Sequence, residues 1–390
     1  MNQKTKSYLL HGSLFLITFV TTTLAGAEWT HGKSILASQD GAIVFNSNYS
    51  WAEFASGLPY SICFLLILTC HEFGHYFTAV YYRVRTTLPF YLPLLPFFPF
   101  FGTLGALIRI KQPIRTNKQQ FDIGIAGPLA GLAVALGFLI YGFVTLPPPD
   151  YVFQFHPEYQ KFGLDYANHV YDPATQPPGV IDVVIGKNLL FVLLEKIFAD
   201  PAHMPNPHEI MHYPFLFAGF LSLVFTGLNL LPIGQLDGGH VLYGLVGYRW
   251  HKIIATMAFF CILCITGLGL ITLNSPIQQL VWQSGLYLLF LYMSMRSIFE
   301  KKRDRMMYAL IIFTSQYVIT WLWPSIHGYS GWFLFTMLIG FFVGVPHPPS
   351  EIEQPLNLTR KILGWFALTV FILCITPDPI GLIESTKVTP

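Results

Sequence analysis

Charged side chains are scarce in this 390-residue chain: Asp, Glu, Lys and Arg make up only 11% of it, whereas a soluble domain carries about 25%. Hydrophobic residues make up 53%, and the mean hydropathy is +0.52. The formal net charge is +2, and no basic run is interleaved with aromatic residues as in a nucleic-acid-binding face. We therefore expect no nucleic acid as a partner, and the composition predicts a multi-span membrane protein in a lipid bilayer.

Cysteine is also rare, and all five cysteines lie within apolar segments. This placement excludes a disulfide framework of the kind found in small secreted domains. Cys261 and Cys264 form a CxxC pair in the apolar run "FFCILCITGLG". Reactive cysteines need a polar, accessible setting, so we expect these two to pack within a helix and not to serve redox or metal chemistry.

Long apolar runs are what the chain has in abundance. A membrane-crossing helix needs about 20 apolar residues, and nine stretches approach this length. They lie at 8–25, 58–82, 121–146, 211–236, 253–274, 278–296, 306–323, 329–345 and 362–377. The predicted fold class is therefore all-α, a polytopic transmembrane helical bundle of about nine spans.

One apolar segment, residues 88–110, does not suit a simple helix because it carries four prolines within eleven residues. It follows the second span and predicts a re-entrant segment or a short β-strand, which membranes tolerate only where protein or water covers the backbone. Within it, "GTLGALIRIK" (102–111) alternates enough to offer a strand edge. The sequence leaves open whether this piece is a strand or only packs.

Lys and Arg predict the orientation, because cytoplasmic connections carry an excess of them. Every second connection between the nine stretches is basic, and the loop 147–210 carries eight acidic residues against three lysines. We therefore expect this loop outside. The first span is expected to be an uncleaved anchor, although "LAGA" resembles the cleavage site of a signal peptide. In either case residues 28–57 lie outside.

The second span contains the sequence "LTCHEFGHYF" (68–77), with ionisable residues in an apolar run. Such residues are costly in a bilayer and usually mark function. On a helix, HExxH places two imidazoles one turn apart, where both bind Zn²⁺ while the Glu acts as general base. We therefore expect His71 and His75 to bind zinc and Glu72 to be the base. The alternative is a pair of histidines that only hydrogen bond between packed helices.

Zinc in a catalytic site needs a third protein ligand, and Asp237 is the best candidate. His75 lies eight residues before Arg83, and Asp237 lies twelve before Arg249, so both end at similar depth on the same side. His240, three residues after Asp237, is the alternative.

Other candidates for the third ligand fit less well. His203, His208 and His212 belong to the outer side, and Asp122 lies at the entrance of a span. Asn229 and Pro232 are predicted to break the helix ahead of Asp237. Asn229 either hydrogen bonds at this kink or contacts substrate, and the residues alone favour neither.

Three motifs together resemble the site-2 protease family of intramembrane zinc metalloproteases. They are "HEFGH" (71–75), "GIAGPLAGL" (124–132) and "NLLPIGQLDGG" (229–239). The family has HExxH, a Gly-Pro in the following span, and NxxPxxxLDG, in the same order. The match covers roughly residues 58–247.

This resemblance implies roles for single residues. It implies the zinc ligands His71, His75 and Asp237, the base Glu72, the substrate-positioning Asn229, and the structural residues Gly127, Pro128 and Pro232 near the cleft. The chain departs from better-known branches, because the loop 147–210 is too short for a PDZ domain. The expected division is an anchor and outer loop (1–57), a catalytic core (58–247) and additional spans (248–390).

We therefore predict an intramembrane zinc metalloendopeptidase acting in regulated intramembrane proteolysis. Its substrate would be a single-span membrane protein, and its active site would face the cytoplasmic side of a cell or inner membrane if the chain is bacterial. The alternative is a polytopic metal transporter or a non-catalytic membrane binding protein. A transporter would need polar residues through the later spans, and 253–296 shows almost none.

Overall fold

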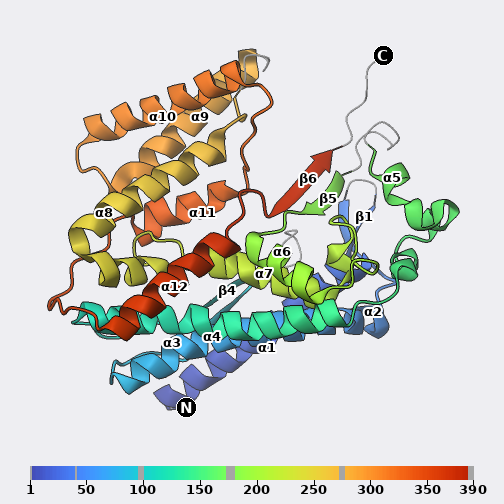
Figure 1. Ribbon diagram of the computed structural model, residues 1–390, viewed down its shortest axis with the longest axis horizontal. Helices are drawn as coiled ribbons and strands as arrows, with labels where there is room; N and C mark the ends of the chain where they lie inside the picture. The colour runs from blue at the N-terminus through green and yellow to red at the C-terminus, as the bar shows by residue number, and fades with distance from the viewer. Residues whose placement is uncertain (1, 40–41, 95–100, 173–180, 272–276, 385–390) are drawn as a thin grey trace. The chain divides into compact units, whose positions relative to one another are not determined.

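The computed structural model (Figure 1) describes residues 2–39, 42–94, 101–172, 181–271 and 277–384. These residues are mostly helical and include three two-stranded antiparallel sheets, which confirms the helical fold class. The chain divides into two compact units. The first unit comprises Met1–Pro113, Ala126–Gly227 and Leu373–Pro390, and the second unit comprises Ile114–Ile125 and Leu228–Ile372.

The first unit holds the N-terminal helices, the loop 147–210 and all three sheets. Its α-helices are α1 (Gln3–His31), α2 (Trp51–Ser56), α3 (Leu58–Tyr81), most of α4 (Asn117–Val144), α5 (Ala167–Val170), α6 (Leu189–Phe198) and most of α7 (Pro214–Asn229). Its 3₁₀ helices are η1 (Pro149–Gln154), η2 (Pro157–Asp165) and η3 (Ile210–His212). Its strands are β1 (Leu36–Gln39), β2 (Ala42–Phe45), β3 (Phe90–Pro93), β4 (Thr103–Leu107), β5 (Ile181–Ile185) and β6 (Ile380–Glu384).

The second unit is helical in its described part and begins with the first turns of α4. It contains α8 (Asp237–Gly267), α9 (Ile277–Ser294), η4 (Met295–Ser297), α10 (Lys302–Leu322), α11 (Trp332–Leu338), the π-helix η5 (Ile339–Val343) and most of α12 (Leu358–Cys374). Figure 1 shows α9 and α10 side by side. An ion pair joins α4 to α12 in this unit, as described below.

Helices α1 and α3 pack against each other in the first unit (Figure 1). Gly57, which precedes α3, lies so close to the Thr23 carbonyl that a Cβ would overlap it. Thr22 Oγ1 and Ser61 Oγ, one on each helix, lie 2.6 Å apart in a buried hydrogen bond. Membrane helices pack closely through small and hydroxyl residues. The packing of α1 against α3 therefore fixes the position of the helix that carries the HExxH motif.

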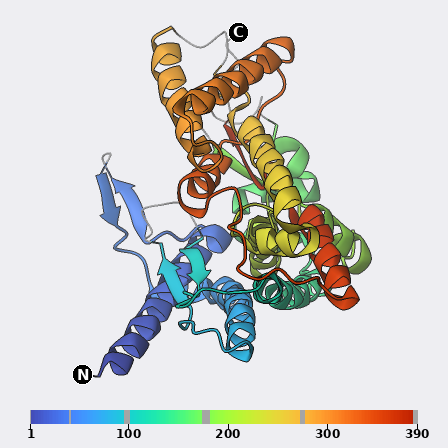
Figure 2. The same cartoon turned by 90° about the vertical axis from the view of Figure 1, so that its left-hand side faces the viewer.

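The segment after α3 forms a β-hairpin, which confirms the strand interpretation of 102–111. Strand β3 pairs with β4 in an antiparallel register that joins Phe90 to Leu107. Thr21 Oγ1 of α1 donates a 2.6 Å hydrogen bond to the Gly102 carbonyl, so the hairpin lies beside α1 (cyan arrows, Figure 2). Residues 95–100 of the predicted re-entrant segment lie outside the described residues.

The number of membrane spans differs from the prediction. Four helices of the described residues are long and apolar enough to cross a membrane: Lys4–His31 of α1, α3, α4 and α8. The other predicted spans fall on shorter or more polar helices; α7, for example, has 16 residues. The described residues therefore support four spans by length and composition, and not nine.

The boundary between α7 and α8 corrects two predicted spans. Helix α7 ends at Asn229, so 211–236 is too long. The physical reason is Pro232, which cannot continue a helix, and the left-handed Gly234 (φ 57°). The next span begins at Asp237 and not at residue 253, although α8 breaks at Gly247 (φ 76°, ψ 174°). Residues 272–274 lie outside the described part, and the predicted division into three domains stays a prediction.

The loop 147–210 holds more structure than the sequence indicated. Strand β5 in this loop pairs with β6 near the C-terminus, with Ile185 opposite Ile380. The same loop contains helix α6, whose N-cap Asn188 accepts a 2.9 Å hydrogen bond from the Phe191 amide. Residues 173–180 of this loop lie outside the described residues.

All five cysteines are free, as expected from their apolar surroundings. Cys261 is exposed and Cys264 is half-buried, both on the apolar second half of α8. No disulfide therefore constrains the fold of the described residues.

Candidate functional site

The two motif histidines lie one turn apart on α3, with their ring nitrogens facing each other. The Nε2 atoms of His71 and His75 are 3.0 Å apart, and the two residues are only 6% and 7% exposed. Two nitrogens bound to one tetrahedral zinc at 2.0–2.1 Å would lie about 3.3 Å apart. The type, spacing and burial of these donors therefore fit a zinc ion.

Helix α4 packs on this pair through glycines. A Cβ at Gly127 would overlap the Nε2 atom of His75, and a Cβ at Gly131 would lie 3.1 Å from the Cβ of His71. Side chains at these positions would push the imidazoles out of place. The glycines of "GIAGPLAGL" are thus explained by the close approach of α4 to the two histidines.

The contact between α3 and α4 is close along the backbone as well. Gly74, inside the HExxH motif, faces α4 so closely that a Cβ would lie 2.5 Å from the Ala126 carbonyl oxygen. Pro128 is buried within α4. Because proline has no N–H, the carbonyl of Gly124 lacks its usual helical donor. The predicted structural residues Gly127 and Pro128 therefore lie where α4 meets the motif.

Glu72 is 5% exposed and lies between the two histidines in the sequence of α3. One turn earlier, Thr69 Oγ1 and Tyr91 OH share a 2.8 Å hydrogen bond, which fixes β3 of the hairpin to α3. Glu72 therefore contributes a buried carboxyl group to the helix that carries the two histidines.

The remaining predicted site residues belong to the second unit. Asn229 is the last residue of α7, and Asp237 is the first residue of α8; both are half-buried. An acidic residue in the first turn is favourable because of the helix dipole. Gly238 follows, and a Cβ there would overlap the Leu230 carbonyl oxygen. The glycine therefore lets the turn containing Pro232 fold back on the start of α8.

Two alternative ligands have other partners in the second unit. Asp122 accepts a bidentate pair of hydrogen bonds from Arg360, with Nε–Oδ1 and Nη2–Oδ2 distances of 2.8 Å each. His240 shares a 2.8 Å hydrogen bond between its Nδ1 and Nε2 of His347. The ion pair occupies the Asp122 carboxylate, whereas the hydrogen bond of His240 uses only Nδ1 and does not decide between His240 and Asp237.

The histidines of the loop 147–210 form contacts of their own in the first unit. His203 pairs with Asp200, and His208 pairs with Asp182. His212, however, lies in a buried group with His156 and Glu209 that has the composition of a metal site. The sequence analysis missed this group, although "HEIMH" at 208–212 is a second HExxH sequence.

Comparisons with known proteins agree with the motif on α3. The sequence model of peptidase family M50 matches residues 59–273, more than half of the chain. The chain is 28% identical over 239 residues to probable zinc metalloprotease EGY1, chloroplastic, of Oryza sativa subsp. japonica, covering 60% of this chain and 34% of that protein. The same protein of Arabidopsis thaliana is 28% identical over 241 residues, covering 62% and 37%.

A further relative is probable zinc metalloprotease EGY2, chloroplastic, of Arabidopsis thaliana. It is 24% identical over 193 residues, covering 50% of this chain and 29% of that protein. The matched region thus spans about a third of the length of these curated relatives.

Proposed function

We propose that this chain, which belongs to peptidase family M50, the site-2 proteases, is an intramembrane zinc metalloendopeptidase. The observation that carries the proposal is the buried pair His71 and His75 on a helix apolar enough to span a membrane. Glu72 adjoins the pair, and Gly127 leaves room for the His75 ring. Such a set is expected for hydrolysis by metal-activated water.

Asp237 is proposed as the third zinc ligand, giving a set of two imidazoles and one carboxylate. Contacts of α4 support it. Gly127 lies against His75, while a Cβ at Gly124, one turn earlier, would lie 2.8 Å from the His240 Cβ and 3.4 Å from the Asp237 carbonyl oxygen. Gly124 thus leaves room for the start of α8, which carries Asp237, as Gly127 leaves room for the His75 ring.

Each residue then has a defined task. When bound, zinc lowers the pKa of a coordinated water and polarises a carbonyl. His71, His75 and Asp237 would hold the metal. Glu72 accepts the proton of the attacking water and later returns it to the leaving amine. The amide of Asn229 donates a hydrogen bond to the substrate backbone, which positions the scissile bond.

A helical substrate must unwind locally before its peptide bond is accessible, because its amides are hydrogen bonded within the helix. Strand β4 pairs with β3 on one side, and no other described strand pairs with it. An extended substrate adding to its other edge would satisfy its own backbone groups. Leu104 and Leu107 on β4 are 58% and 46% exposed, as expected of a strand that contacts an apolar partner.

The proposed substrate is a single-span membrane protein, cleaved in or near the bilayer on the cytoplasmic side. The basic connection between α3 and α4 and the acidic loop 147–210 after α4 support this orientation. The names of the relatives place those proteins in the chloroplast. For this chain we propose a cellular or organellar membrane whose basic connections face the compartment of synthesis.

The direct test uses detergent-solubilised protein and a panel of membrane-segment peptides. We expect cleavage that stops when a chelator removes zinc and resumes when Zn²⁺ is returned. Zinc uptake into sealed vesicles, with no cleavage of any peptide, would instead identify a transporter. Tight binding of peptides without cleavage would identify a non-catalytic binding protein.

A further inference from the structure

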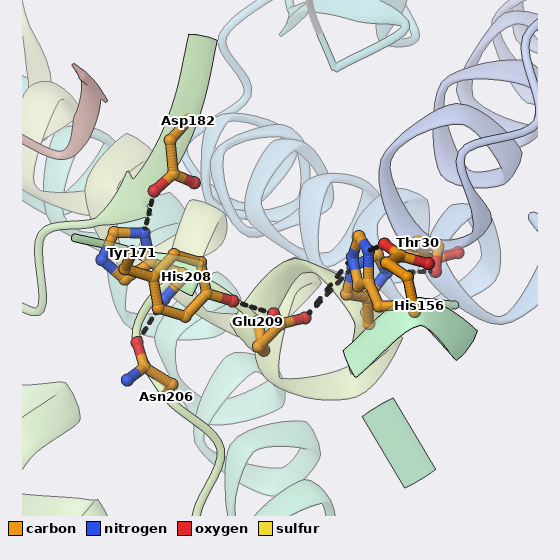
Figure 3. A network of polar contacts seen from close by, with 9 residues as sticks. Thr30, His156, Tyr171, Asp182, Asn206, His208 and Glu209 are labelled. Carbon is orange, nitrogen blue, oxygen red and sulfur yellow. Dashed lines mark hydrogen bonds and ion pairs between the residues drawn. The ribbon is translucent and has the colours of Figure 1, made fainter. Parts of the chain in front are cut away.

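A second group of side chains of the kinds that bind metals lies in the first unit, and Figure 3 shows His156 and Glu209 of this group. It consists of His156 before η2, and Glu209 and His212 at η3. One ligand atom from each residue lies within 4.8 Å of the other two. Glu209 is 1% exposed and His212 is 7% exposed, so the group is largely withdrawn from water.

Hydrogen bonds fix the direction in which both imidazoles present their lone pairs. His212 Nδ1 lies 2.8 Å from the Thr30 carbonyl oxygen, which can only accept, so this nitrogen carries the proton. His156 Nδ1 lies 3.2 Å from a carboxylate oxygen of Glu158 and is the donor there for the same reason. In neutral rings the Nε2 atoms are therefore both acceptors. They face each other at 3.1 Å.

The carboxylate of Glu209 adds a third acceptor to the two imidazoles. Its Oε2 lies 3.4 Å from His212 Nε2 and 3.8 Å from His156 Nε2, and this buried atom has no hydrogen-bond partner among the described residues. Its other oxygen accepts a hydrogen bond from the Tyr171 hydroxyl (Figure 3). An unsatisfied buried carboxylate oxygen is costly, and a cation between the three acceptors removes this cost.

Aromatic rings hold the two imidazoles in place. Phe155 stacks on His212 with ring centroids 4.4 Å apart and planes at 7°. Tyr159 stacks on His156 with centroids 4.5 Å apart and planes at 10°. Metal-binding histidines are typically oriented by a hydrogen bond at the other nitrogen and by an apolar surrounding, and both features are present here.

We propose that His156, Glu209 and His212 form a second divalent-metal site, selective for Zn²⁺ or a cation of similar preference. Two imidazoles and one carboxylate are ligands that zinc accepts, with a fourth position for water. The side chain of His156 is 30% exposed, which provides an entry path. The site does not depend on the proposed protease activity.

The local fold explains why the second HExxH sequence works differently from the first. Residues 210–212 form a 3₁₀ turn and not an α-helix, so His208 and His212 do not share one face. His208 instead pairs with Asp182 at 2.7 Å. Glu209 becomes a ligand, and His156 from the preceding part of the loop takes the place of the other histidine.

Metal binding here would tie three segments together. His156 belongs to the loop that follows α4, and Glu209 and His212 precede α7. His212 also hydrogen bonds to the carbonyl of Thr30 on α1. We therefore expect zinc at this site to stabilise the loop 147–210 against unfolding, because a ligand that binds only the folded state stabilises it.

The experiment uses full-length protein in detergent carrying His71→Ala and His75→Ala, so that zinc retained in the background belongs elsewhere. After equilibration with Zn²⁺ and gel filtration, we expect about one zinc per chain by mass spectrometry and a higher Tm than after chelation. Glu209→Gln in this background should no longer bind this zinc, and Zn²⁺ should no longer raise its Tm. Its amide can donate to the imidazoles, so the fold is retained.

The matched control is His203→Asn, which removes a loop histidine that pairs with Asp200 at the surface and should leave the zinc unchanged. His156→Gln, at the exposed side of the group, decides the matter if Glu209→Gln fails to fold. A background protein that retains no zinc would overturn the site, and so would full retention in the two variants. The group would then be a hydrogen-bond network without a metal.

Discussion

Gly127 lies against the His75 ring, so the size of residue 127 determines where this imidazole can be. The same helix brings Gly131 close to His71. These glycines bind no metal, yet they decide whether the two Nε2 atoms remain 3.0 Å apart. At the scale of single residues, the zinc pair thus depends on small neighbours as well as on its ligands.

The variant Gly127→Ala tests this dependence. Its methyl group would overlap the His75 ring, so we expect zinc affinity to fall by about 10–100-fold, as when other supporting residues of metal sites are changed. Gly137→Ala is the matched control on α4, because a Cβ there meets nothing within 4 Å. It should keep zinc and stabilise the protein by about 0.5–1 kcal/mol. Equal zinc binding by the two variants would contradict the role of Gly127.

The variants Asp237→Ala and His240→Ala decide the third ligand. Removing the Asp237 carboxylate should release most zinc from the α3 site, because two imidazoles alone hold it weakly. His240→Ala should retain zinc, because Asp237 is the proposed ligand in the motif "NLLPIGQLDGG". The measurement is metal content in a Glu209→Gln background, which excludes the second site. The reverse pattern would assign the ligand to His240.

Local spacing made part of the site predictable. His71 and His75 could be paired from the sequence because their helix fixes their separation. The predicted helix break ahead of Asp237 is present. Asp237 does not follow the end of the span 211–236, however, but is the first residue of α8. The group of His156, Glu209 and His212 was not predicted. An irregular loop brings its members together, and such a loop has no regular residue spacing from which contacts can be read.

At the scale of elements, composition predicted the helices but not their ends. Apolar length located α1, α3 and α4, whereas α7 ends early because of a proline that follows it. The pairing of β5 with β6 joins segments almost 200 residues apart, and short strands carry no signal for so distant a partner. The alternation of 102–111 offered a strand as one of two interpretations, and β4 is that strand, but its pairing with β3 was not predicted.

Proline at Ile108 tests the strand edge. Arg109 N donates to Thr87 Oγ1, and Lys111 N donates to the Arg85 carbonyl, so both amides face the hairpin. Successive amides of an extended strand point in opposite directions, so the Ile108 amide faces away from the hairpin. Ile108→Pro should impair cleavage while zinc content stays normal, because proline removes a donor for the substrate. Ile108→Ala keeps the amide and should cleave nearly as the wild type does. Normal cleavage by the proline variant would leave the hairpin a packing role only.

At the scale of the whole molecule, the described residues contain four helices able to cross a membrane, and the α3 motif lies on one of them. Proteolysis at this depth needs a metal, a base and an unwound substrate together. We identify no candidate catalytic residues on the described helices after α8. Glu72 on α3 is therefore the residue that decides whether the protein is an enzyme or only binds zinc.

The most direct test is Glu72→Gln, with zinc content, capture of a membrane-segment substrate and product measured on the same preparation. Glutamine keeps the size of the side chain but cannot accept a proton from water. We predict unchanged zinc and substrate capture, and cleavage lower by about 10²–10⁴-fold, the usual contribution of general acid–base catalysis. Glu300→Gln, at an exposed position, should cleave as the wild type does. Cleavage by Glu72→Gln at the wild-type rate would contradict the proposed mechanism.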